Sequence, residues 1–373
     1  MIEKVLLIVI FSSLPSSFFT QVDDVLSDSF IENINNQNLS WVAGRNFPEN
    51  EAKEFLEFGI INYTNLDASN TLDTLNHRTF YYSYIPPVFD ARRKWPECKD
   101  LINSNLRYVK MCANDVWASA TAKVMNDRIC IETKGKTRVS LSGEDIRTCC
   151  SFCQNAIPYD TNWPPSQLRH TTPFNAWKYW VRHGVATGGD WKTDIGCKPR
   201  FTTTSGCKFK CKFECTNKKY KTGYWRDKRR GRFAYTVNKD PKQIQIEIME
   251  HGPVLAVMNY YPELLSYKSG IFKLKKNSRR LGHHLVKIIG WSFEKKVDYW
   301  IVAGNMGDGF GKDHGFIKIP IGEYELGIEA HVTAGRSETP LSPREYLVPS
   351  TSEETQLNIS LLVLNVLMAV VLM

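Results

Sequence analysis

Apolar and polar positions follow two different patterns along this chain. In residues 28–36, 51–60 and 116–125 the apolar side chains recur at the spacing of one helix face. After about residue 250 they occur instead in short runs bounded by glycine and turn residues: PVLAVMNYY, HHLVKIIGW, DYWIVAG and HGFIKI. Such runs predict β-strands. Helices followed by strands indicate an α+β fold, with two packed halves and a cleft between them.

Capping residues place the ends of the helices. Asn114 or Asp115 can cap the helix that starts just after them. Ser142 is a candidate N-cap for a second helix within residues 140–150. A third helix, PFNAWKYWVRHG, ends at Gly184, the residue type that most readily closes a helix.

Both ends of the chain are apolar. Residues 1–20 predict a secretory signal peptide, with a buried N-terminal strand as the alternative. Residues 339–373 combine a polar spacer with a hydrophobic tail. The tail's last 15 residues fall short of the ~20 that a membrane span needs. Small residues before the spacer favour a GPI-attachment signal; a tail anchor and a docked helix are the alternatives. The candidate lipidated residues are Ser350, Thr351 and Ser352.

Composition supports the secretory interpretation. The 373 residues include ten cysteines, and 42% of them are hydrophobic, so a sizeable core stabilised by disulfides is expected. Asn38 and Asn62 stand in glycosylation triplets. We therefore expect an extracellular, lysosome-like or cell-surface location.

Charge divides the chain near residue 85. Residues 21–84 hold ten acidic and three basic side chains, a net charge of −7. Residues 1–20 have no net charge, and the whole chain carries +9. Residues 85–373 therefore have a net charge of +16. A segment opposite in sign to the body it precedes is typical of a prosegment held against that body. The simpler alternative is a flexible acidic leader.

An ordered set of motifs carries a family resemblance. These are LSDSFIENINNQNLSWVAGRNF, FDARRKWPEC, NDRICI, TCC, GWSFEKKVDYWIVA and GIEAHVTAG. The chain resembles the papain family, in its cathepsin B branch, from about residue 26 to 339. The resemblance implies a helical half and a β-barrel half with a peptide cleft between them. It also implies a prosegment at 21–84 and a peptidase domain at 85–338.

The family's catalytic residues are largely replaced. Its nucleophilic cysteine precedes a tryptophan, which here is Trp117, so the nucleophile position falls on Val116. The oxyanion glutamine falls on Lys110, or on Val109 after a one-residue slip. Neither residue is an amide, and valine has no ionisable or nucleophilic atom.

One catalytic element remains. His284 stands at the general-base position, and Gly304 stands where the family has the asparagine that orients this histidine. Asn305 follows but could substitute only by a strand slip, which would turn its side chain to the other face. We also considered Cys112 and Ser119 as nucleophiles and disfavour both, because neither matches the expected helix start.

The substrate-binding elements also depart from the family pattern. No glycine lies between Cys153 and Trp177, where the family has a Gly-Gly pair. Thirteen residues separate Cys197 from Cys211 and include no histidine, so the two histidines of the cathepsin B occluding loop are absent. His331 occupies the position of the S2 glutamate, and Trp117 is the other pocket residue that the resemblance implies.

The resemblance implies four disulfides and leaves two cysteines over. The implied pairs are Cys98–Cys130, Cys149–Cys211, Cys150–Cys153 and Cys197–Cys215. Cys112 and Cys207 remain; they could be free, paired with each other or intermolecular. No metal or other cofactor is expected.

A basic segment with interleaved aromatic residues spans residues 208–232, with eleven Lys or Arg against two acids. Behind a signal peptide, sulfated glycans or anionic membranes are more natural partners than nucleic acid. The alternative is a solvated basic face that also holds the acidic prosegment. The residues assigned to glycan binding are Lys208, Lys210, Lys218, Lys219, Arg229 and Arg230.

Together these features predict a catalytically inactive, cathepsin B-like protein that acts outside the cell by binding. Its expected partners are a peptide, a peptidase inhibitor or a prosegment. The alternatives are an active lysosomal or secreted cysteine peptidase and a matrix-like structural protein.

Overall fold

The computed structural model describes residues 25–46, 52, 55–56, 60–61, 66, 72–77, 84–104, 116–153, 173–190, 193–200, 210–275, 277–304 and 306–338. All of them belong to the compact unit Met1–Leu341. The predicted signal peptide and tail, together with Asn62, Lys110, Cys112, Cys207 and Asn305, lie outside the described residues, and the expectations for them stay predictions.

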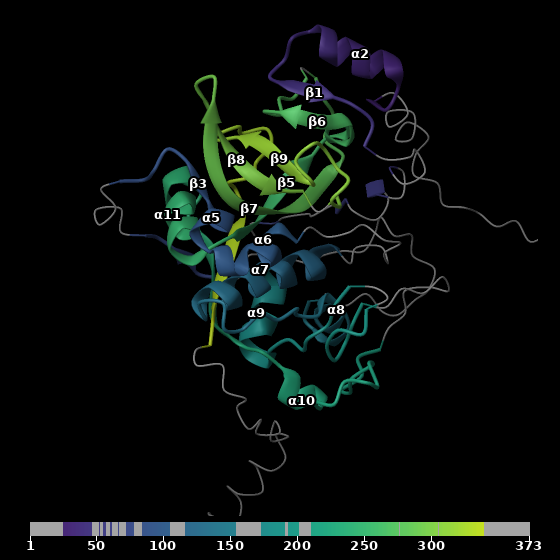
Figure 1. Cartoon of the computed structure of the whole chain (residues 1–373), viewed down its shortest axis with the longest axis vertical. Coiled ribbons are helices and arrows are strands. Elements are labelled where there is room, and N and C mark those ends of the chain that lie inside the picture. Colours follow the sequence, from purple (N-terminus) through teal and green to yellow (C-terminus); the bar gives the residue numbers. More distant parts are fainter. Residues whose placement is uncertain are drawn as a thin grey trace, which may run out of the picture. The chain divides into compact units, whose positions relative to one another are not determined.

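The N-terminal part adds one helix and two short strands to the body. Helix α2 (Asp28–Asn36) starts at Ser27, whose hydroxyl accepts a hydrogen bond from the Phe30 amide. Strand β1 (Trp41–Ala43) follows and pairs antiparallel with β6 (Tyr267–Gly270), beside α2 in Figure 1. Strand β2 (Thr74–Leu75) then pairs in parallel with β4 (Gly231–Val237).

The helical half is built around one buried helix, α7 (Val116–Glu132), which packs against α8 and α9. Ser142 caps α8 by accepting from the Asp145 amide, and Gly184 follows α9 with a φ of +70°, as the sequence predicted. The other helical bounds are α5 (Ala91–Lys94), η2 (Pro96–Cys98), α6 (Lys99–Asn103), α8 (Gly143–Cys149), α9 (Pro173–His183) and α10 (Tyr224–Asp227).

The second half is an antiparallel sheet apart from β2, in the order β2-β4-β10-β5-β7-β8-β9, with β3 paired to β7 (Figure 1). Its remaining elements are β3 (Phe89–Asp90), α11 (Pro241–His251), β5 (Val254–Tyr260), η4 (Pro262–Ser266), β7 (Gly282–Glu294), β8 (Val297–Ala303), β9 (Phe316–Pro320) and β10 (Val332–Ser337). The predicted α+β fold is confirmed, and each predicted strand lies within or overlaps an observed one.

The two largest hydrophobic clusters of the described residues lie beneath this arrangement. The larger fills the β half and takes in side chains of α2 and β1. The other surrounds α7 and extends to Leu255, Val257 and Leu285 on β5 and β7. Because one cluster contains residues of both halves, the start of α7 and the start of β7 are held together by packing.

The structure contains the four disulfides that the resemblance implied: Cys98–Cys130, Cys149–Cys211, Cys150–Cys153 and Cys197–Cys215. The last three tie the loops of the helical half together, and none involves the N-terminal part, whose residues 21–84 contain no cysteine. Among the described residues no helix is long and apolar enough to cross a membrane.

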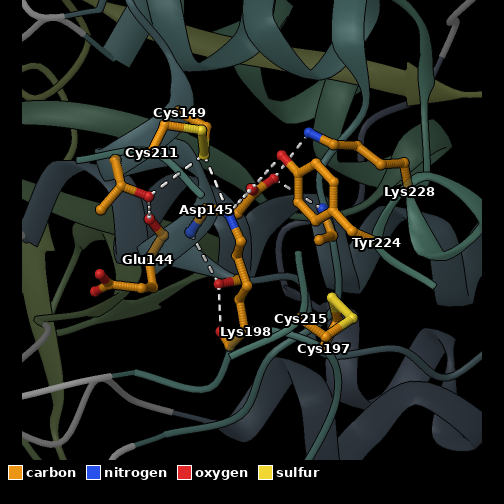
Figure 2. A network of polar contacts seen from close by, with 12 residues as sticks. Glu144, Asp145, Cys149, Cys197, Lys198, Cys211, Cys215, Tyr224 and Lys228 are labelled. Carbon is orange, nitrogen blue, oxygen red and sulfur yellow. Dashed lines mark hydrogen bonds and ion pairs between the residues drawn. A yellow bond between two sulfur atoms is a disulfide. The ribbon is translucent and has the colours of Figure 1, made fainter. Parts of the chain in front are cut away.

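A buried charge network supports these loops. Figure 2 shows the Asp145 carboxylate between Lys198, Tyr224 and Lys228. Its oxygens lie 3.1 Å from the Lys198 ammonium and 3.0 Å from that of Lys228, and the Tyr224 hydroxyl donates at 2.8 Å. Burial alone would raise the pKa of Asp145, but the ammonium groups of Lys228 and Lys198 outweigh it and hold that pKa below its usual value.

The Asp145→Asn substitution should therefore destabilise the fold strongly. It leaves two buried ammonium groups without their carboxylate, and breaking a buried pair in this way costs about 3–5 kcal/mol. The free energy of unfolding, measured by urea titration with disulfides intact, gives the test. Asp194→Asn is the matched control, because Asp194 pairs with Lys219 at the surface and should contribute little. Equal midpoints for the two variants would contradict the role assigned to the network.

Candidate active site

Val116, at the first position of α7, is an apolar, buried side chain. It is 3% exposed and belongs to the cluster that surrounds the helix. Two residues of the N-terminal part, Ile61 and Leu66, belong to the same cluster. The position that the resemblance assigns to the nucleophile is therefore packed as core.

His284 lies on β7 opposite Met258 of β5 and is fully buried. Its Nε2 atom is within hydrogen-bonding distance of the Gly304 carbonyl oxygen. A carbonyl can only accept, so Nε2 carries a proton in this contact. The ring nitrogen thus contacts the backbone of Gly304, the residue at which the resemblance places an asparagine side chain.

Gly304 has limited room for a side chain. A Cβ atom there would lie 2.9 Å from Ile317 Cδ1 and 3.0 Å from Met306 Cε. Both atoms are the ends of flexible side chains, which can move by the few tenths of an ångström required. An asparagine at this position is therefore strained but not sterically excluded.

The N-terminal part covers the histidine. The Phe55 ring meets the His284 imidazole edge-on, with centroids 5.4 Å apart, and Tyr260 packs against it at 5.6 Å. One residue before His284, His283 exchanges two backbone hydrogen bonds with Ile61, of 2.9 and 2.8 Å. Ile61 therefore spans the site: its side chain packs in the Val116 cluster and its backbone pairs with β7.

His283, where the family usually has glycine, is kept neutral by its surroundings. Burial, assisted by the nearby Arg280 guanidinium, lowers the pKa of His283 to about 4. Its ring lies 3.5 Å from Arg280 Nη1, and Arg280 also donates to Asn259 Oδ1 at 3.1 Å. The site consequently has the neutral imidazole of His283 beside the positive charge of Arg280.

The two other predicted pocket residues are buried to different extents. Trp117 is 1% exposed within the core cluster. His331 is half-buried, and its carbonyl accepts from the Val257 amide. Asn38, the glycosylation candidate, is exposed just after α2.

Ser119 lines a cavity of about 90 Å³ with Lys123 and Arg200, and the Arg200 guanidinium donates to its hydroxyl at 3.3 Å. Within the described ranges, no group of three or more His, Cys, Asp or Glu side chains could hold a metal ion.

The sequence predicted a prosegment held against the body, but not its individual contacts with the site. Phe55 fell in a predicted helix, but nothing in the pattern indicated that it contacts His284.

The basic segment is also less open than predicted. Arg229 and Arg230 are half-buried, and Arg229 donates to the Asp227 carbonyl at 2.8 Å. Lys218 and Lys219 are exposed but pair with Glu214 and Asp194.

Comparison with known proteins agrees with this geometry. Residues 85–336 match the model of the papain family cysteine protease, and residues 26–56 match that of the peptidase family C1 propeptide. The chain is 35% identical over 267 residues to cathepsin B-like cysteine proteinase 4 of Caenorhabditis elegans, covering 67% of this chain and 75% of the relative. It is 33% identical over 289 residues to a cathepsin B-like cysteine proteinase of Schistosoma japonicum, covering 72% and 78%.

Among solved structures, the procathepsin B S9 of Trypanosoma congolense superposes with a TM-score of 0.68 at 26% identity. The match covers 85% of this chain and all of that one. The digestive procathepsin L2 of Tenebrio molitor, at 17% identity and a TM-score of 0.59, shares the fold. The chain therefore belongs to the papain family of cysteine peptidases, close to its cathepsin B-like members, and carries the family's propeptide ahead of the peptidase domain.

Proposed function

We propose that this chain is a papain-fold protein without peptidase activity that acts by binding. The observation that carries the proposal is Val116, a buried isopropyl group at the start of α7, where the resemblance places the attacking thiolate. Covalent peptide hydrolysis of the papain type requires that thiolate. The proposed setting is the secretory pathway.

The surroundings of His284 support the same conclusion. Its Nε2 proton is bound by a backbone carbonyl, and its ring is enclosed by Phe55 and Tyr260. A polar residue fixed by a backbone acceptor has a structural reason to persist without catalysis. The presence of His284 is therefore not by itself support for activity.

Peptide hydrolysis by the prosegment-free protein should be indistinguishable from buffer. Removing the nucleophile of a serine peptidase costs roughly 10⁶ in turnover. Val116→Cys alone should restore little, because Gly304 supplies no side-chain amide, whereas adding Lys110→Gln and Gly304→Asn should restore more. A fluorogenic dipeptide assay from pH 4.5 to 7.5 measures both effects.

Cys112→Ala is the control for that assay. It tests the leading alternative, an active cysteine peptidase with its nucleophile in the segment before α7. Hydrolysis that a thiol-directed inhibitor blocks and Cys112→Ala abolishes would overturn the proposal. A matrix-like structural role predicts neither hydrolysis nor soluble peptide binding, and a sedimentation measurement of self-association separates it from the binding proposal.

Removal of the prosegment should require another peptidase. Without a nucleophile the chain cannot cut itself, and the exposed stretch around Tyr84, which is 70% exposed, is the expected cleavage region. Purified full-length protein held at pH 4.5 should stay one chain on a denaturing gel, while added active cathepsin B-like peptidase should convert it. Conversion at a rate independent of protein concentration, without added peptidase, would contradict this expectation.

A sulfated glycan is the second candidate partner, and one surface feature favours it. Phe213 and Trp225 are 61% and 46% exposed, and their rings stack at 5.3 Å. The Cys215 sulfur lies 3.3 Å from the Thr222 carbonyl and so brings the two segments together. Lys212 and Arg226 are exposed cations next to these aromatic residues in sequence, and Lys221, four residues before Trp225, is a third exposed cation in the segment. Basic groups beside exposed aromatic rings suit an anionic saccharide.

Neutralising this patch should weaken retention on a heparin column. The double substitution Lys212→Gln and Lys221→Gln removes two exposed charges and should lower the salt concentration of elution, because such contacts are screened by salt. Lys295→Gln with Lys296→Gln, in the exposed turn between β7 and β8, is the matched control of equal charge. Equal shifts for both pairs would indicate retention by net charge alone.

A further inference from the structure

Residues 72–77 lie along the edge of β4, outside the site just described. Thr74 and Leu75 stand opposite Thr236 and Val237 in parallel register. The Thr236 amide donates to the Asp73 carbonyl at 2.9 Å, and the Asn238 amide donates to the Leu75 carbonyl at 3.2 Å. The other edge of β4 is paired with β10, so β2 completes the pairing of β4 on both sides.

Side chains reinforce the backbone pairing. The Thr74 and Thr236 hydroxyls lie 3.0 Å apart, and the Asn238 side-chain amide donates to Asn76 Oδ1 at 2.7 Å. Main-chain bonds hold an added strand, and side-chain contacts select it. The pairing is therefore specific to this stretch of sequence.

His77 closes the stretch and is the most tightly held residue in it. Gln243 of α11 binds its backbone in both directions, accepting from the His77 amide at 2.5 Å and donating to its carbonyl at 3.1 Å. The imidazole Nε2 lies 2.8 Å from a carboxylate oxygen of Glu247. The side chains of His77 and Glu247 are 9% and 0% exposed.

The carboxylate that receives His77 is held in place by the body of the fold. Glu247 lies 2.8 Å from Arg128 of α7, and the Tyr235 hydroxyl donates to it at 2.7 Å. Burial alone would raise the pKa of Glu247, but Arg128 and His77 bring it down to about 2. The pocket is thus fixed by α7, β4 and α11, none of which belongs to the segment it binds.

We propose that the edge of β4, with the pocket formed by Gln243 and Glu247, is a peptide-binding site separate from the cleft, whose ligand is the chain's own extended segment 73–77. Because no cysteine precedes Cys98, only non-covalent contacts, those of this site among them, can hold the prosegment once the chain is cut. The prosegment then remains as a second polypeptide, anchored at β4 as well as at β6 and the cleft.

The test uses the full chain, with residues 79–83 replaced by the recognition sequence of a site-specific protease. After cleavage, gel filtration at pH 7 follows the release of the N-terminal fragment. In the His77→Ala chain the fragment should leave roughly 10-fold to 100-fold faster, because a hydrogen bond to a buried carboxylate is lost. His77→Gln should recover much of the retention, since its amide nitrogen can replace Nε2 as donor.

His314→Ala is the matched control, an exposed histidine before β9, and its fragment should leave at the original rate. If the N-terminal fragments of the His77→Ala and His314→Ala chains are both released too slowly to measure, Trp41→Ala is added to each chain. This substitution weakens the β1–β6 contact, so that the two release rates can be compared. Equal release rates with and without His77 would overturn the proposal, since the other anchors would then be sufficient. The readout needs no substrate, so it is independent of whether the cleft hydrolyses peptides.

Discussion

The position of α7 depends on a buried guanidinium. Arg128 is fully buried, and an uncompensated charge there would be prohibitive. Its donors are taken up by the carbonyls of Pro253, Gly252 and Gly335 and by the carboxylate of Glu247. These acceptors lie around β5, β10 and α11, so the central helix of one half can sit in only one place against the other half.

A second buried ion pair involves Asp127, the residue before Arg128. Asp127 lies 2.8 Å from the Lys287 ammonium on β7, which also donates to the Ile102 carbonyl. Burial raises the pKa of Asp127 even though Lys287 opposes it, so this pair secures geometry more than it adds stability. The two pairs fix the C-terminal part of α7, Asp127 against β7 and Arg128 against α11 and β10, for reasons unrelated to catalysis. The placement of α7 therefore does not depend on a nucleophile at position 116.

The sequence allowed the fold class, four disulfide pairs and the helix ends at Ser142 and Gly184 to be predicted, because family motifs and local capping chemistry carry them; the predicted cap at Asn114 or Asp115 lies outside the described residues. It did not reveal α11, since Ile244, Ile246 and Ile248 alternate as in a strand; Asp240 and Pro241, a cap and a first-turn proline, were the available signal. The burial of Lys228 within a basic run was also hidden. Its partner Asp145 lies 83 residues away, and local composition cannot report such a contact.

The contacts of the prosegment were the least predictable part of the structure. They fill the region around Val116 and His284 with apolar side chains. Phe55, Ile61 and Leu66 pack as core, and β2 covers an edge that would otherwise expose unpaired backbone groups. Losing the prosegment would thus uncover an apolar surface and a free strand edge together. An active peptidase gains an open cleft in return for that exposure. Under the proposed function, a chain with Val116 at the head of α7 gains no chemistry from that exposure, so keeping its propeptide bound would leave both surfaces covered.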